Sequence, residues 1–191
     1  MKPKLPESSF IKPPYEVKGT PKEARASFYE LAKDKIKYLT EEEFVELNQD
    51  MLYNKTLSSP AMNIVNVESL QKGNNLEKWV DYLEITINKD AFKINKKDYS
   101  DLMPFVLEHE IWETWLKAKK GVASTLDRGK KHILAHRRAF LLAEQQGLGD
   151  KFLEWAKLIA PYNTEHIKQC EYALRVARKQ LKKSPWKKNK K

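Results

Sequence analysis

The stretch Leu102–Leu116, which reads LMPFVLEHEIWETWL, has an apolar stripe with helical spacing. The stripe consists of Leu102, Phe105, Val106, Trp112 and Leu116, and His109 lies in the middle of it. Residues three and four positions apart face the same side of an α-helix, so this pattern predicts an amphipathic helix. We expect His109 to lie on the buried face of that helix.

The predicted helix begins at Ser100 and ends at Lys120, because Gly121 follows in the position that favours glycine after a helix. Three further helices are predicted after it. They cover residues 124–147, residues 150–160, and residues 163 onward until Ser184 and Pro185 interrupt the pattern.

The N-terminal half is predicted to be mixed. A loose apolar stripe predicts a helix from Pro21 to about residue 38, and Thr40 with Glu43 forms a capping box that opens a helix to about Leu52. Residues 63–67 and the alternating residues 82–87 are typical of strands. Strands grouped between helices indicate an α+β fold, mainly helical with a small antiparallel sheet.

Charge is concentrated at the C-terminal end of the 191-residue chain. The formal net charge is +10, but the range 175–191 holds nine basic residues and no acidic ones, which leaves 27 basic and 26 acidic residues elsewhere. We therefore predict an extended proline-rich leader over residues 1–20, one domain over residues 21–182, and a disordered basic tail over residues 183–191. This distribution argues against a uniformly basic nucleic-acid-binding domain.

Other classes of protein are also disfavoured. A single cysteine, Cys170, excludes an internal disulfide framework, and no apolar segment approaches the length of a membrane span. The N-terminus lacks the apolar region of a secretory signal, so the expected location is the cytoplasm.

The helix of the opening stretch carries the pattern HExxE, formed by His109, Glu110 and Glu113. His109 and Glu113 are neighbours on one face, and two such side chains at i and i+4 can hold a metal ion. The next helix offers His132 and His136 as a third ligand. Counting residues back from the predicted turn places His136 level with His109 and His132 about 6 Å lower, which favours His136.

A strand at residues 82–87 followed by a helix with the HExxE string resembles the core of zincin-type metallopeptidases. The resemblance implies that zinc is held by His109, Glu113 and His136, and that Glu110 is the catalytic base. It also implies that strand 82–87 lies at a sheet edge and aligns an extended peptide or protein substrate. In that family a histidine stands where this chain has Glu113.

Two alternatives remain open. The chain could instead be a non-catalytic helical protein whose basic tail binds nucleic acid non-specifically, or attaches to another anionic partner or surface. His166 and Cys170 are also spaced i and i+4, and we interpret this pair as ordinary packing.

Overall fold

The structure, a computed structural model, describes residues 35–48, 60–65, 83–120 and 125–183. The described residues between 103 and 183 are mainly helical, as the sequence predicted, with the ends of the helices shifted by a few residues. The helices are α5 (Met103–Lys120), α6 (Thr125–Gln145), α7 (Gly149–Ile159) and α8 (Thr164–Lys183). The predicted leader and all of the predicted tail except Lys183, the last residue of α8, lie outside the described residues.

The sheet is small and mixed. Its strands are β1 (Ile36–Leu39), β2 (Ala61–Val65) and β3 (Leu83–Asn88), in the order β1-β3-β2. β2 pairs with β3 in the antiparallel sense, as predicted, whereas β1 pairs with β3 in the parallel sense. The prediction that a helix extends to residue 38 is therefore wrong over β1, because pairing with the distant strand β3 outweighs the local helical pattern.

β3 is the central strand of this sheet, and the expectation that strand 82–87 is a sheet edge is wrong. Ile85 pairs with Ile36 on one side and with Asn63 on the other. The backbone of β3 is thus occupied on both sides and cannot align a substrate. Among the described strands β2 has an edge position, and Tyr82 lies outside the described residues.

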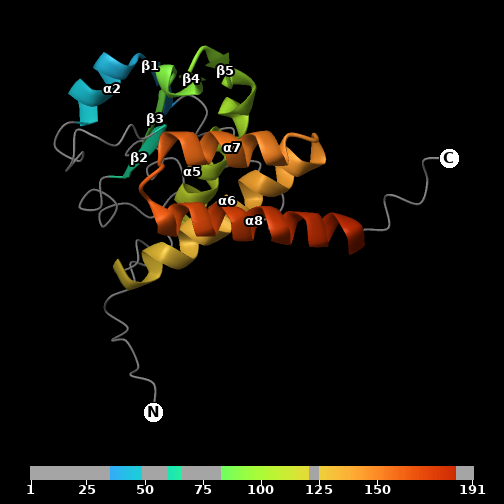
Figure 1. Cartoon of the computed structure of the whole chain (residues 1–191). Coiled ribbons are helices and arrows are strands. Elements are labelled where there is room, and N and C mark those ends of the chain that lie inside the picture. Colours follow the sequence, from blue (N-terminus) through green and yellow to red (C-terminus); the bar gives the residue numbers. More distant parts are fainter. Residues whose placement is uncertain (1–34, 49–59, 66–82, 121–124, 184–191) are drawn as a thin grey trace.

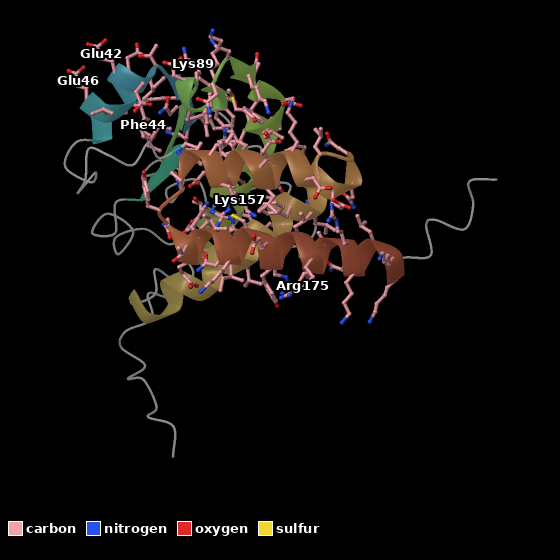
Figure 2. All side chains as sticks on the ribbon, viewed as in Figure 1. Glu42, Phe44, Glu46, Lys89, Lys157 and Arg175 are labelled. Atoms are coloured by element: carbon pink, nitrogen blue, oxygen red, sulfur yellow. The ribbon has the colours of Figure 1, made fainter. Side chains whose placement is uncertain are left out.

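The predicted capping box is confirmed at the start of α2 (Glu41–Asn48). The Glu43 carboxylate accepts hydrogen bonds from the Thr40 backbone N–H at 2.8 Å and from the Thr40 hydroxyl at 3.1 Å. Figure 2 shows Glu42 and Glu46 pointing away from the protein and Phe44 pointing into it. Phe44 is only 1% exposed, so this residue anchors the short helix.

A tight hairpin lies in the segment that connects β3 to the helices. β4 (Lys93–Ile94) pairs with β5 (Lys97–Asp98). Between the two strands Asn95 and Lys96 both have positive φ angles, of 52° and 64°. Two consecutive residues of this conformation are the mark of a type I′ turn.

α6 packs against α5 on one side and α8 on the other, and α7 packs on α6 and α8 (Figure 1). Aromatic side chains fill the space near α7: Trp155 stacks on Phe92 with ring centroids 4.9 Å apart, and Phe140 lies 4.5 Å from Phe152. The Trp155 indole N–H donates to the backbone carbonyl of Ala91 at 2.9 Å, which satisfies its buried polar group. The aromatic cluster fixes the position of α7 relative to the sheet region.

Two short helical turns, η3 (Asp90–Phe92) and η4 (Ser100–Leu102), lie on either side of the hairpin. The buried Tyr99, next to η4, donates its hydroxyl to Glu154 of α7 at 2.9 Å. This hydrogen bond connects the end of the sheet–helix connection to α7. None of the helices in the described residues combines the length and the apolar character needed to cross a membrane.

Candidate metal centre

The histidines of the chain, four in all, come together in one cluster. His109 comes from α5, His132 and His136 come from α6, and His166 comes from α8. The His136 ring is central to the cluster: its centroid lies 4.3 Å from that of His109, 4.4 Å from that of His132 and 5.1 Å from that of His166. Helices that are far apart in the sequence therefore bring their imidazoles to one place.

Three of these imidazoles could hold a metal ion. The ligand atoms of His109, His132 and His136 all lie within 4.8 Å of one another, and Nε2 of His132 is 3.0 Å from Nε2 of His136. Nitrogen ligands about 2.0 Å from a tetrahedral zinc ion lie about 3.3 Å apart. The His132–His136 spacing is close to that value and the other pairs lie within 4.8 Å, so small side-chain adjustments would close the site around an ion.

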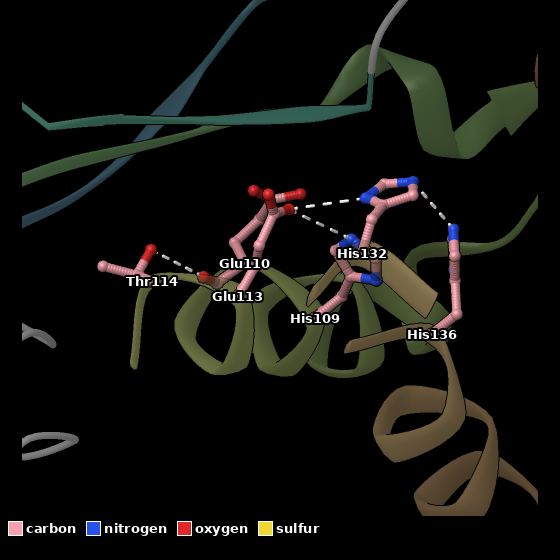
Figure 3. Close-up of polar contacts among 6 residues, drawn as sticks. All are labelled: His109, Glu110, Glu113, Thr114, His132 and His136. Carbon is pink, nitrogen blue, oxygen red and sulfur yellow. Dashed lines mark hydrogen bonds and ion pairs between the residues drawn. The ribbon is translucent and has the colours of Figure 1, made fainter. Parts of the chain in front are cut away.

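Glu113 lies beside two of the histidines on the α5 side of the cluster (Figure 3). Its Oε2 atom is 3.4 Å from Nδ1 of His132 and 3.7 Å from Nε2 of His109. The Glu113 side chain is only 8% exposed, whereas that of His132 is 37% exposed. His132 is therefore on the side of the cluster that opens to solvent, and Glu113 is on the enclosed side.

Glu110 is also buried, at 8% exposure, and lies one turn of α5 before Thr114. The Thr114 hydroxyl donates to the Glu110 backbone carbonyl at 2.8 Å, which ties down this turn of the helix (Figure 3). Glu110 lines the same cavity as the histidines, and that cavity has a volume of about 300 Å³. Its lining also includes the aromatic side chains of Phe140, Phe152 and Trp155. The cavity thus combines imidazoles and a carboxylate with apolar wall.

Burial keeps the central imidazole neutral. Desolvation, with the neighbouring His109 and His132, holds the pKa of His136 well below its usual value of 6.5. A neutral imidazole has a free lone pair for a metal ion, and no proton must first be displaced at neutral pH. The electrostatics of His136 therefore suit a metal ligand.

The α8 side of the cavity holds His166 and Cys170, the pair that the sequence indicated as packing. Cys170 Sγ lies 3.6 Å from Nε2 of His166. Burial chiefly raises the pKa of the Cys170 thiol to about 12 and lowers the pKa of His166 to about 4. Both groups are neutral at pH 7, so this pair is not an activated thiolate–imidazolium nucleophile.

The structure brings His109 and His136 together, and Glu110 lines the same cavity. The set of ligand atoms within 4.8 Å of one another contains His132 in place of the predicted ligand Glu113, which lies beside His109 and His132. His132, which the sequence placed about 6 Å lower, lies with them. Its i, i+4 spacing to His136 was the signal for this, because side chains one turn apart on a helix can reach a common point.

Comparison of the chain with protein-family models, curated proteins and solved structures finds no match. The geometry of the histidine cluster and of the cavity is therefore the main indication of function.

Proposed function

We propose that the protein is a zinc-dependent hydrolase, with the zinc ion held by His109, His132 and His136. The observation that carries this proposal is the convergence of three ligand nitrogens within 4.8 Å beside the buried Glu110. Three protein ligands and one open position are the arrangement of catalytic rather than structural zinc sites. When bound, zinc in such a site polarises a carbonyl group and lowers the pKa of a water molecule.

Glu113 takes a positioning role in this proposal. Its carboxylate is closest to Nδ1 of His132, and accepting the proton of that nitrogen leaves Nε2 of His132 directed toward His136. Carboxylates that orient ligating imidazoles in this way also raise their basicity. The HExxE string thus supplies one ligand, one base and one residue that orients a ligand.

Glu110 is the general base of the proposed reaction. It takes a proton from the attacking water and returns it to the leaving amine as the acyl bond breaks. The apolar wall of the cavity accommodates a hydrophobic side chain of the substrate. We propose a peptide or protein as substrate, on the strength of the likeness to zincin-type metallopeptidases in the HExxE helix.

Metal analysis and hydrolysis of labelled casein test this function on the full chain. Glu110→Gln should keep the zinc content of the wild type and lose activity by about 100-fold or more, because a general base contributes on that scale. His109→Ala should lose activity. In a chain whose neighbouring Cys170 is also replaced by serine, His109→Ala should lose the zinc as well. A zinc content of His109→Ala/Cys170→Ser equal to that of Cys170→Ser alone would overturn the proposal, as would full activity in Glu110→Gln.

Glu108→Gln is the matched control on the same helix. Glu108 accepts a hydrogen bond from Arg138 at 2.8 Å and faces away from the cavity. This variant should keep both zinc and activity. Loss of both in Glu108→Gln would mean that the assay reports helix stability and not the site.

A second candidate function is the binding of nucleic acid by the basic end of α8. The observation that favours it is the exposure of Arg175, Lys179, Lys182 and Lys183 along that end of the helix. Arg178 is matched by Glu144 and Asp150, but these four cations face solvent. Truncation after Leu181 should weaken binding of single-stranded DNA at low salt, and unchanged binding would exclude this end of the chain as the contact.

A further inference from the structure

α8 brings two more metal-ligating side chains to the cavity, His166 and Cys170. They lie one turn apart on the helix, and both line the cavity that the α5 and α6 histidines also line. Cys170 is 1% exposed, and its Sγ is 3.6 Å from Nε2 of His166. Sulfur and nitrogen ligands at about 2.3 and 2.0 Å from a tetrahedral zinc ion lie about 3.5 Å apart. The pair therefore already has the spacing of two ligands on one ion.

His136 completes a set of three. The ligand atoms of His136, His166 and Cys170 all lie within 4.8 Å of one another. His136 belongs to this set and to the set formed with His109 and His132, because α6 lies between α5 and α8. Two nitrogens and one sulfur form a softer set of ligands than three nitrogens.

We propose that His136, His166 and Cys170 form a second metal site, selective for thiophilic divalent ions such as Zn²⁺, Co²⁺ or Cd²⁺. Binding forms a metal–sulfur bond and releases the Cys170 thiol proton to solvent, so no oxidant or reductant is needed. Neither Glu110 nor His109 belongs to this site. It shares His136 with the first site, and a neutral imidazole has one free lone pair, so the chain binds an ion in one site or in the other.

Cobalt titration of the metal-free full chain tests this site directly. A thiolate bound to Co²⁺ gives a charge-transfer absorption in the near ultraviolet, and Cys170 is the only cysteine of the chain. The wild type should show this band, with equal intensity per chain at low and high protein concentration. Cys170→Ser should abolish the band, and His166→Ala should lower the apparent cobalt affinity measured from it by at least about 10-fold.

Two variants serve as controls. Gln169→Ala lies on the same turn of α8 and should leave the band unchanged, because Gln169 donates to Glu165 and does not line the cavity. His109→Ala removes a ligand of the first site only and should also keep the band. Far-ultraviolet circular dichroism of each variant checks that the helices are intact.

Failure of this inference has its own signature. A wild-type chain that binds cobalt without the thiolate band would show that Cys170 only packs, and the second site would be overturned. An apparent cobalt affinity that is unchanged in His166→Ala would overturn the second site as well. If Cys170→Ser does not fold, the wild type can be alkylated in the presence and absence of Cd²⁺. We expect that Cd²⁺ protects the Cys170 thiol from alkylation, and absence of protection would overturn the inference. Neither result depends on the activity of Glu110→Gln or on the zinc content of His109→Ala/Cys170→Ser, which test the proposed hydrolase.

Discussion

At the scale of single residues, the buried imidazoles set how stability depends on pH. The pKa of His166 is lowered to about 4 in the folded protein, from 6.5, by burial and by the nearby His132 and His109. Between these two values the unfolded chain binds more protons than the folded one. Stability that is fully present above pH 6.5 is therefore lost as the pH falls toward 4. His136 acts in the same direction, because its pKa is lowered too.

We predict that the unfolding free energy of the metal-free protein falls by about 1–2 kcal/mol between pH 6.5 and pH 5 through His166. Urea denaturation at several pH values, with a chelator present, measures this change. His166→Gln removes the titrating group and leaves every carboxylate in place, so its stability should fall less over the same range. An identical fall in both proteins would contradict the prediction.

Much of the candidate site could be predicted at this scale, because helical spacing determines which side chains share a face. His109, Glu110 and Glu113 were predicted from one string, and His136 from a residue count along two adjacent helices. The residue count placed His132 about one turn below His109 and His136, because it measures only the rise along the helix axis. Long side chains that are one turn apart can still reach the same point. The part played by His166 and Cys170 depends on how α8 packs on α6, and no local pattern carries that information.

At the scale of secondary-structure elements, the β4–β5 hairpin is a point of strain. Asn95 tolerates a positive φ angle, but Lys96, at 64°, carries a Cβ in a conformation that costs most residues about 1 kcal/mol. Glycine has no such cost and is the preferred second residue of a type I′ turn.

We predict that Lys96→Gly stabilises the protein, by up to about 1 kcal/mol, despite the greater flexibility of glycine in the unfolded chain. Urea denaturation of the variant and the wild type measures the difference. Lys93→Gly is the matched control: Lys93 is an exposed lysine in the neighbouring strand, whose glycine variant should be less stable. A loss of stability in Lys96→Gly equal to that in Lys93→Gly would contradict the assignment of the turn.

The elements also show where sequence patterns succeed and fail. The capping box at Thr40 and the long amphipathic helices are local features, and the structure confirms them. α6 ends at Gln145, and Gly147 (φ 76°) lies just beyond this end, where the backbone N–H groups of Gly147 and Leu148 donate to the carbonyls of Glu144 and Ala143. β1 was missed because its hydrogen-bond partner is β3, whose paired residues follow 49 positions later in the sequence.

At the scale of the whole molecule, the histidine cluster and the basic end of α8 are well separated. His166 is in the first turn of α8 and Lys183 is its last residue, and this distance along a helix is about 25 Å. Figure 1 shows that the C-terminal part of α8 extends beyond the other helices. An anionic partner held there would therefore not block the cavity, so the two candidate functions are compatible in one molecule.

The same architecture predicts how metal removal affects stability. Ligands from α5, α6 and α8 meet at His136, so a bound ion connects helices that unfolding would separate. An ion that binds only the folded chain stabilises it by about 2.7 kcal/mol at a concentration 100 times its Kd. For a domain of this size that corresponds to a rise in Tm of about 5–10 °C.

We therefore expect zinc to raise the Tm of the wild type and a chelator to reverse the rise, as measured by thermal denaturation followed by circular dichroism. His136→Ala should lose most of the shift, because this residue is common to both sets of ligands, whereas Glu108→Gln should keep it. His109→Ala should keep part of the rise in Tm. That part should disappear in the double variant His109→Ala/Cys170→Ser, because the second set of ligands then also lacks a member. A full shift in His136→Ala would mean that zinc binds elsewhere, and the cluster would then stabilise the fold through packing alone.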